Sequence, residues 1–522
     1  MDAAVAAAWA LAVCEPGNSG LGGQTTLLIR LASGDILLID GHSRAPAAVS
    51  LDTVSHKQQR VGYRATTVPT TPIVLETARR CYGRLAGNAV LEPAIRLAQD
   101  GYRITRLQRR QVGWCHTSLS ASPSASSLLL DRGRLYDEGT LFVQPLLAAT
   151  LRRIGSYGAD DFYHGQIARD IARDMQANGG LLTPEDLAQV NAPTPQSPLS
   201  TIYRNWTVVT APPPGGGMQV LLGLKILSHL DLSARDDPFA WYRDMGEITY
   251  LVFREREQRA MNTVGALLGR GDSGPMEERA ASLSEEIQHA DKQVHLDPEK
   301  PRRTFLSDAE EPGETTHLCT ADAEGNVVSL TQSIQSLFGA RVVCRPCGFL
   351  YNNYLVTCPR GRHPNQLAGG CLPRSNAAPT ILLRTASDPP KITHRPNENP
   401  TTEIALALGA AGSRRITSSI LQTIGGFVER DMSLVEAVDA PRIHVKQSRN
   451  VWLEQSCQTE ALLPMLSRRF RSVELGPRHS YAMGCVQAIQ VNSDGQAVGV
   501  ADPRREGTAI VMGSVSTARA VE

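Results

Sequence analysis

Apolar residues spaced by three and four positions predict helices through much of the first half of the chain. The predicted helices cover residues 2–13, 88–100, 147–178 and 247–262. Gly179 and Gly180 follow the third of them and are typical of a helix end. The sequence Thr183-Pro184-Glu185-Asp186 then predicts another helix start, with a hydroxyl at the N-cap, proline at the first helical position and a carboxylate three residues after the cap.

Alternating apolar and polar residues predict two β-hairpins. The first joins residues 25–31 to 35–40 through Ser33-Gly34, and the second lies in HLCTADAEGNVVSLTQS (317–333), with its turn at 322–326. Two segments show neither pattern. PPPGGG (212–217) predicts a loop, and residues 270–313, polar and rich in charge and proline, predict a mobile surface segment or linker.

A chain of 522 residues allows one large domain or two, with a substantial core. Lys and Arg number 53 against 52 Asp and Glu, so the net charge of +1 argues against a nucleic acid or an anionic membrane as partner. The longest apolar stretch, 3–13, is too short for a transmembrane helix, which needs about 20 residues. Ten cysteines are too few for a disulfide scaffold.

The N-terminus bears on localisation. Asp2 is the only charge before the apolar stretch, whereas a secretory signal begins with basic residues. We therefore expect a cytoplasmic protein from the chain as written. Its abrupt start in a helix-like run also suggests a missing upstream segment, and with a leader the protein would be periplasmic or extracellular.

Two short motifs in the polar segment are interpreted as coincidental. GDSGP at 271–275 matches the nucleophile loop of trypsin-like proteases, but those enzymes need a His and an Asp earlier in an all-β chain. The surrounding sequence is mixed helix and strand, which argues against that chemistry. Arg270-Gly271-Asp272 is interpreted as a solvated loop and not as an adhesion signal.

Four cysteines near the middle of the chain allow three interpretations. Cys344 and Cys347 are two residues apart, and Cys358 and Cys371 follow. A structural zinc site usually has a second close pair of ligands, and none follows here. Unlinked thiols are favoured, with a disulfide and a metal site as the alternatives.

The main candidate for catalysis is Thr315, a hydroxyl residue that opens a predicted strand directly after the acidic segment. In this setting the Thr315 hydroxyl can attack the Glu314 carbonyl, and hydrolysis of the resulting ester frees Thr315 as a new N-terminus. Its α-amine, with a pKa of about 7.7–8.0, then serves as the general base for its own hydroxyl. Such chemistry implies no metal and no organic cofactor.

Two further features suit such a nucleophile. Thr331, Ser333 and Gln335 alternate on the second strand of the hairpin, so they project from one face and can line one pocket. Residues 409–413, GAAGS, precede an amphipathic run over 414–430, and amides at a helix start can stabilise an oxyanion. An ordinary helix start beside a tight turn is the alternative, and the residues alone favour it.

Ordered motifs extend over nearly the whole chain. They are NSGLGG (18–23), LEPAIRLAQDGY (91–102), FYHGQIA (162–168), GGLLTPEDL (179–187), PPPGGG, ETTHL, DAEGNVVSLTQS, SLFG, LYNN, PRSNAAPTI, GAAGSRRIT and ADPRREG (501–507). Together they resemble the γ-glutamyltransferases, which are N-terminal nucleophile hydrolases matured by autocleavage. The number of ordered matches makes this resemblance specific.

The resemblance implies an α/β (α+β) fold, an αββα sandwich in which two subunits from one precursor interleave. Residues 1–314 would form the large subunit, with a mobile segment at about 270–314, and 315–522 the small one, together one structural domain. The active protein would be a heterodimer of its own two fragments. Its substrates would be γ-glutamyl amides such as glutathione, with water, an amino acid or a peptide as acceptor.

The resemblance also implies roles for individual residues. Thr315 resembles the nucleophile, and Ser333 stands where the family has a Thr that hydrogen-bonds the nucleophile and assists processing. Gln335 replaces an Asn that contacts the substrate. The remaining matches are Ser375 and Asn376, in the place of paired serines that hold the glutamyl α-carboxylate, and Gly412 and Ser413, in the place of the oxyanion glycines.

Two substitutions change the expected substrate pocket. His42 occupies the place of the family's carboxylate-binding Arg, with Arg44 two residues on, and Thr357 replaces the Asp that binds the α-ammonium. A buried ammonium without its counter-charge is disfavoured by several kcal/mol.

Tyr354 and Thr357 therefore motivate an alternative, an acylase of the glutaryl or cephalosporin type for amides without a free α-amino group. Glu314 before the cleavage site, together with the altered pocket, allows a third hypothesis, a non-catalytic homologue that binds or scaffolds.

Overall fold

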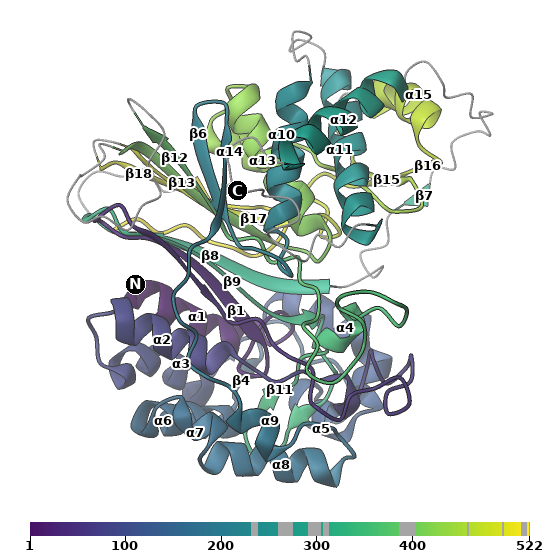
Figure 1. Ribbon diagram of the computed structural model, residues 1–522. Helices are drawn as coiled ribbons and strands as arrows, with labels where there is room; N and C mark the ends of the chain where they lie inside the picture. The colour runs from purple at the N-terminus through teal and green to yellow at the C-terminus, as the bar shows by residue number, and fades with distance from the viewer. Residues whose placement is uncertain are drawn as a thin grey trace. The chain divides into compact units, whose positions relative to one another are not determined.

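The described chain forms two compact units, each of them a mixture of helices and strands (Figure 1). Unit 1 contains Met1–Ala32, Ile36–Ser197 and Gly313–Ser375, and unit 2 contains the other segments. Both units hold residues from before and after position 315. The computed structural model describes residues 1–230, 238–258, 275–290, 304–305, 313–385, 402–456, 459–492, 495–512 and 519–520.

A four-stranded antiparallel sheet organises unit 1. Its order is β2 (Ile36–Asp40), β1 (Gln24–Arg30), β9 (Val327–Ser336) and β8 (Gly313–Ala321), so both predicted hairpins are confirmed. The register places apolar side chains on one face, as in the pairs of Leu330 with Leu27 and Leu318. Thr26, Thr331 and His317 align on the opposite face.

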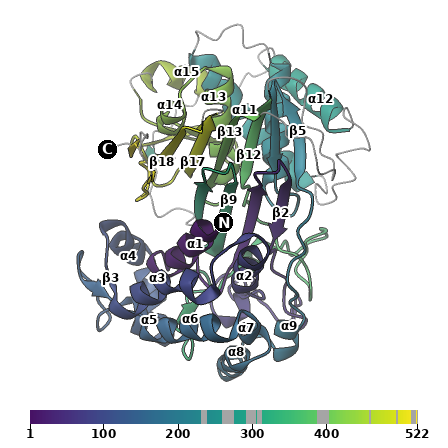
Figure 2. The same ribbon diagram turned by 90° about the vertical axis from the view of Figure 1, so that its left-hand side faces the viewer.

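Helices cover the apolar face of this sheet (Figures 1 and 2). The alanine-rich start of the chain forms α1 (Asp2–Cys14), whose small side chains pack against β8 and β9, and α2 (Thr71–Tyr82) lies on β1 and β2. Behind them, α3 (Gly87–Asp100) packs on both α1 and α6 (Pro145–Tyr157). The predictions for 2–13 and 88–100 are therefore confirmed.

The prediction of one continuous helix over 147–178 is wrong. Gly158, with φ of +79°, ends α6, and two helices follow, α7 (Asp160–Tyr163) and α8 (Gln166–Ala177). The capping motif is confirmed, because the Thr183 and Asp186 side chains each bond the other's backbone at the start of α9 (Pro184–Ala188). The other elements of unit 1 are η1 (Tyr63–Ala65), β3 (Tyr102–Arg103), α4 (Arg106–Ser120), α5 (Pro123–Leu129), β4 (Leu141–Phe142), β10 (Val343–Cys344), β11 (Phe349–Leu350) and η3 (Tyr354–Thr357).

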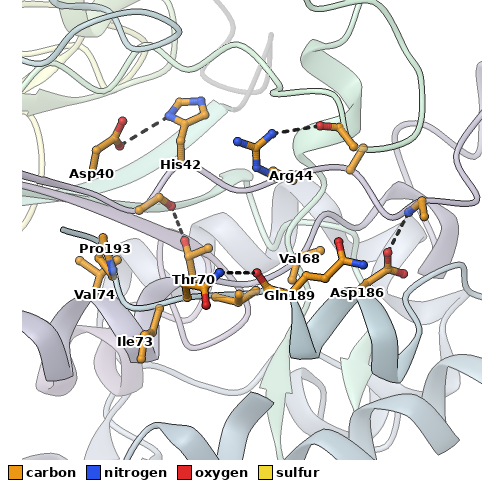
Figure 3. A pocket seen from close by; sticks show the side chains of 16 residues that line it. Asp40, His42, Arg44, Val68, Thr70, Ile73, Val74, Asp186, Gln189 and Pro193 are labelled. Carbon is orange, nitrogen blue, oxygen red and sulfur yellow. Dashed lines mark hydrogen bonds and ion pairs between the residues drawn. The ribbon is translucent and has the colours of Figure 1, made fainter. Parts of the chain in front are cut away.

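A cavity of about 290 Å³ opens in unit 1 beside the end of β2 (Figure 3). Apolar side chains such as Val68 and Ile73 line it together with His42, Arg44 and Gln189. Asp186 also lines it, but that carboxylate is bonded to the Thr183 and Ala47 amides.

Unit 2 contains a seven-stranded sheet and a smaller four-stranded one. The large sheet runs β19 (Arg519–Ala520), β18 (Ala497–Ala501), β17 (Cys485–Asn492), β13 (Thr402–Ala411), β12 (Thr380–Thr385), β6 (Trp206–Thr210) and β5 (Leu199–Tyr203). The small sheet runs β14 (Ile443–Val445), β15 (Asn450–Glu454), β16 (Ser472–Gly476) and β7 (Thr304–Phe305). Helices α13 (Arg415–Glu429), α14 (Leu434–Asp439) and α15 (Thr459–Arg469) complete the C-terminal part.

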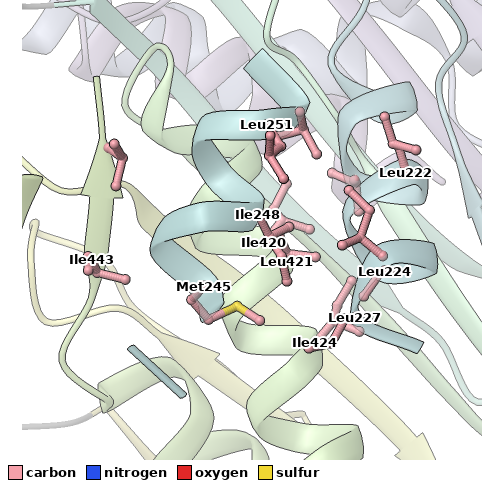
Figure 4. Close-up of a cluster of buried hydrophobic side chains, with 14 of the residues drawn as sticks. Leu222, Leu224, Leu227, Met245, Ile248, Leu251, Ile420, Leu421, Ile424 and Ile443 are labelled. Carbon is pink, nitrogen blue, oxygen red and sulfur yellow. The ribbon is translucent and has the colours of Figure 1, made fainter. Parts of the chain in front are cut away.

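The core of unit 2 lies between three helices (Figure 4). Leu224 and Leu227 of α10 (Gly217–His229) contribute to it with Ile248 of α11 (Pro238–Gln258) and Ile420 of α13. The predicted 212–217 loop thus ends one residue early, at the start of α10. The helix predicted over 247–262 begins earlier, at Pro238, and residues 259–262 lie outside the described chain.

The prediction of a mobile segment over 270–313 is wrong for residues 275–290. They form α12 (Pro275–Ala290), whose Ala280, Leu283 and Ile287 are buried against the core. The apolar periodicity did not predict this helix, because its few apolar residues are interspersed with charged ones. These charges pair with neighbouring helices, as in the Arg279–Glu255 ion pair. The Arg-Gly-Asp sequence and all of GDSGP but Pro275 lie outside the described residues.

Within the part of the chain that the structure describes, we find no helix long and apolar enough to span a bilayer.

Four charged side chains are buried together in unit 2. Arg504 bonds Glu454 at 2.5 Å and Asp502 at 3.1 Å, and Arg442 bonds Asp502 at 2.7 Å; all four side chains are at most 2% exposed. Burial alone raises the pKa of Asp502, but the two guanidinium charges bring it below its usual value. These ion pairs tie β15, the α14 region and the segment after β18 to one another.

We expect Arg504→Met to lower the free energy of unfolding by about 3–5 kcal/mol, since it leaves two carboxylates buried without their main cation. Urea denaturation followed by fluorescence measures the change. Arg84→Met, which removes the exposed Arg84–Glu324 pair, is the matched control and should leave the midpoint unchanged. Equal midpoints for the two variants would show that the buried network is not stabilising.

Candidate active site

The β8–β9 ladder is irregular at Thr315. Thr316 pairs with Gln332 and Glu314 with Gln335, so the single residue Thr315 faces both Ser333 and Ile334. Such a bulge redirects side chains and is frequent beside active sites. Gln335 directly follows the bulge. Its φ of +82° is a backbone conformation that residues other than Gly and Asn rarely adopt.

The Ser333 hydroxyl lies between the Thr315 hydroxyl and the peptide bond before it. Thr315 Oγ1 donates to Ser333 Oγ at 3.3 Å, and Ser333 Oγ donates to the Glu314 carbonyl oxygen at 2.7 Å. The backbone N–H of Gln335 donates to Ser333 Oγ at 2.9 Å. Thr315 and Ser333 are 5% and 4% exposed, so the three bonds form away from bulk water. A donor at the Glu314 carbonyl stabilises negative charge that develops on that oxygen.

Thr331, predicted to line the same pocket, has a different partner. Its hydroxyl is 2.9 Å from His317 Nδ1, and the His317 Nε2 is 3.2 Å from Cys319 Sγ. Burial lowers the pKa of His317 to about 3, so this imidazole is neutral at physiological pH. The His317–Thr331 pair extends the polar face of the sheet next to the Thr315–Ser333 pair.

Tyr354 links the nucleophile to the PRSN segment. Its hydroxyl interacts with the Ser333 and Ser375 side chains, which oppose the effect of burial on its pKa. Burial raises the pKa of Tyr354 to about 12, so the phenol keeps its proton at neutral pH. The structure thus brings together Thr315, Ser333, Tyr354 and Ser375, all of which the sequence singled out.

Sequence reasoning missed Gln24. This residue is 2% exposed and pairs with Ser333 across β1 and β9. Its Oε1 accepts from both the N–H and the hydroxyl of Ser43, at 3.0 and 2.8 Å. The available signal was its place directly after the NSGLGG motif.

Thr357 lies at the end of η3, next to a positive charge. The Thr357 hydroxyl donates to the Tyr354 carbonyl at 2.9 Å, and the Arg374 Nε donates to the Thr357 carbonyl at 3.1 Å. The position where the resemblance led us to expect a carboxylate therefore carries a neutral hydroxyl with a guanidinium beside it. Arg374 was missed by the sequence analysis, although it directly precedes Ser375.

His42 and Arg44 line the cavity of Figure 3. The His42 Nε2 is 2.8 Å from the Pro373 carbonyl oxygen, which places the ring next to the PRSN segment. Arg44 is exposed, and its Nη1 donates to the Gly370 carbonyl at 3.4 Å. The described residues that line this cavity include neither Thr315 nor Ser333.

The other predicted site residues belong to unit 2. Asn376 accepts a hydrogen bond from Arg256 Nη1 of α11, a residue that sequence reasoning also missed. Gly412 and Ser413 form the turn between β13 and α13, with φ of +124° and +55°. Their carbonyls accept from the Arg415 and Ile416 amides, so the turn leads directly into the positive N-terminal end of α13. An oxyanion role for this pair stays a prediction.

The cysteines carry free thiols where the structure describes them, including Cys344, Cys347, Cys358 and Cys371. Over the same residues, no group of three or more His, Cys, Asp or Glu side chains is arranged to hold a metal ion.

Comparison with known proteins shows to which family the chain belongs. The family model described as Gamma-glutamyltranspeptidase matches residues 1–512. The chain belongs to the gamma-glutamyltranspeptidase family. The resemblance seen in the sequence motifs is thereby confirmed.

Relatives within the gamma-glutamyltranspeptidase family carry two kinds of name. A "Glutathione hydrolase proenzyme" from Escherichia coli (strain K12) is 28% identical, over 97% of this chain and 86% of the relative. An "Acylase ACY 1 proenzyme" from Pseudomonas sp. (strain SE83) is 30% identical, over 98% and 89% of the two chains.

Solved structures share the mixed α/β fold. The cephalosporin acylase from Bacillus halodurans superposes with a TM-score of 0.79 at 24% identity, over 100% of this chain and 91% of the other. A Helicobacter pylori gamma-glutamyltranspeptidase chain gives a TM-score of 0.50 at 29% identity, over 55% of this chain and 84% of the other.

We expect Gly412→Ala to destabilise the protein by about 2 kcal/mol or more. The new Cβ would lie 2.9 Å from the Gly484 Cα, at a φ that side chains rarely adopt. Ser413→Ala is the matched control, because that position already carries a Cβ at positive φ, and it should change the unfolding midpoint little. A Gly412→Ala variant as stable as the control would contradict this view of the turn.

Proposed function

We propose that the protein is a self-processing threonine hydrolase that transfers an acyl group from an amide, through Thr315, to water or an amine. The observation that carries the proposal is the chain of hydrogen bonds from the Thr315 hydroxyl through Ser333 to the Glu314 carbonyl. The names of the relatives, proenzymes of glutathione hydrolases and acylases, agree with it.

In the precursor, Thr315 Oγ1 attacks the Glu314 carbonyl carbon while its proton passes to Ser333 Oγ. Ser333 gives its own proton to the carbonyl oxygen as the new C–O bond forms, so that the tetrahedral intermediate is neutral. The Gln335 amide, which donates to Ser333 Oγ, holds Ser333 in place. The proton on the former carbonyl oxygen then passes to the Thr315 nitrogen, the C–N bond breaks and the re-formed carbonyl leaves an ester. Water then hydrolyses the ester, which frees the Glu314 carboxylate and leaves Thr315 with its amine and its hydroxyl.

After cleavage, the Thr315 amine accepts the proton of its own hydroxyl as that oxygen attacks the substrate amide. The Ser333 hydroxyl, no longer bonded to Glu314, remains beside the nucleophile. We assign the Gly412 and Ser413 amides to the oxyanion. The proposal includes an αββα sandwich with interleaved subunits 1–314 and 315–522, and the presence of both segments in each unit agrees with that interleaving.

The acyl pocket favours a group without an α-ammonium. Thr357 and Tyr354 are neutral, Ser375 is a hydroxyl, and the nearby charge at Arg374 is positive. A free γ-glutamyl group would bring its ammonium towards that guanidinium, whereas a glutaryl-type group lacks the ammonium and keeps the terminal carboxylate. We therefore propose an acylase for dicarboxylic acyl amides, with γ-glutamyl amides such as glutathione as the second candidate.

We expect the wild-type chain to divide into 1–314 and 315–522 on a denaturing gel, and Thr315→Ala to remain intact. Ser333→Ala should slow cleavage about 100-fold or more, since it removes the donor at the Glu314 carbonyl. Ser329→Ala, on the same strand and face, is the matched control and should cleave at the wild-type rate. Normal cleavage of Ser333→Ala would refute the proposed relay.

Substrate preference is tested with glutaryl-p-nitroanilide and γ-glutamyl-p-nitroanilide. We expect a higher kcat/KM for the glutaryl compound. Thr357→Asp supplies a counter-charge for the ammonium, so we expect it to shift the ratio of the two kcat/KM values about tenfold or more towards the γ-glutamyl compound. This shift is equivalent to about 1.4 kcal/mol. Thr357→Val, which has the same shape and no charge, should keep the wild-type preference. A wild-type preference for γ-glutamyl would establish the second candidate instead.

A further inference from the structure

Cys358 and Cys371 face each other across a short loop of unit 1. Their sulfur atoms are 3.7 Å apart and hydrogen bonded. Cys358 is 3% exposed, whereas Cys371 is only partly buried. A disulfide needs the sulfurs to approach to about 2.05 Å, so a small side-chain movement joins them.

The two thiols differ in acidity. The contact with Cys358 lowers the pKa of Cys371, against the opposing effect of burial, and the Ala368 amide adds to the lowering. The same contact, with burial, raises the pKa of Cys358 well above its usual value. The accessible sulfur is thus the better nucleophile near neutral pH, and the buried one is placed to resolve a mixed disulfide.

Among the cysteines that the structure describes, the others lack this combination. Cys344 and Cys347 are both buried, and burial raises the pKa of Cys344. Cys81 is exposed, and its neighbours in the chain contain no second cysteine. Reactivity with small oxidants requires both thiolate character and access.

The thiol pair connects three segments of the acyl pocket. Cys358 directly follows Thr357, and Cys371 comes three residues before Arg374. The Cys371 carbonyl accepts from the Ala45 N–H at 2.9 Å, and the Gly370 N–H donates back to the Ala45 carbonyl at 3.1 Å. A bond between the sulfurs would therefore fix Thr357 relative to the PRSN segment and to the loop that carries Arg44.

We propose that Cys358 and Cys371 form a reversible disulfide that changes how the acyl pocket binds its substrate. The pocket effect rests on the proposed function, whereas formation of the disulfide does not.

The oxidant is a low-molecular-weight disulfide. The Cys371 thiolate attacks one of its sulfurs, the S–S bond breaks, and one small thiol leaves after taking up a proton. Cys358 then attacks the Cys371 sulfur and releases the second small thiol, which takes the Cys358 proton. Two protein thiols are oxidised and one small disulfide is reduced to two thiols.

The first test is mass spectrometry of the full-length protein after incubation with glutathione disulfide. Trypsin cuts at Arg360 and Arg362, between the two cysteines, so a disulfide appears as two linked peptides that separate on reduction. We expect this link in the wild type and in the control Cys81→Ser, and a glutathione adduct on Cys371 in Cys358→Ser. An absent link, or a Cys371 that reacts no faster than Cys81, would overturn the proposal.

The second test compares oxidised and reduced protein in p-nitroanilide hydrolysis. We expect oxidation to change KM at least threefold while kcat changes less, and Cys371→Ser to be insensitive to the oxidant. A link that forms without any change in KM contradicts the pocket effect. Absence of amidase activity from the reduced, cleaved protein contradicts the proposed function and leaves the disulfide to be judged by the peptide masses alone.

Discussion

One hydroxyl group holds the candidate active site together. Ser333 Oγ receives hydrogen bonds from the Thr315 hydroxyl and the Gln335 amide, and it donates to the Glu314 carbonyl. Its position depends on the bulge, which sets two residues of β9 against one of β8. A regular ladder would give Thr315 a single partner residue and would remove this convergence. The positive φ of Gln335 shows that the backbone accepts strain at this point.

In the proposed acyl pocket, charge would decide which acyl groups bind. The Arg374 guanidinium donates to the Thr357 backbone carbonyl, which places a positive charge beside the neutral Thr357 side chain. Tyr354 stays protonated over the physiological pH range, and burial raises its pKa further. Both features suit an anionic or neutral acyl group better than a zwitterionic one. The family fold is compatible with either substrate, since relatives named as glutathione hydrolases and as acylases align over nearly the whole chain.

Local patterns predicted the elements around the nucleophile well. The alternation that leads to Thr315 and Ser333 predicted β8 and β9, and small residues before an amphipathic run predicted the β13–α13 turn. Residues that act through long-range contacts were missed. Gln24 reaches the site across the sheet from Ser333, and Arg256 reaches Asn376 from a helix 120 residues away. No local periodicity reports such contacts, and α12 was missed because its charges obscured its apolar face.

The composition of the two units has a consequence for the proposed fragments. Strand β1 comes from before residue 315 and pairs with β9 from after it, and β6 pairs with β12 in the same manner. Separating the fragments would therefore break both sheets and unfold both units. Because dissociation and unfolding would be one event, the folded state at working concentrations would resist dilution far more than a heterodimer docked through surfaces alone.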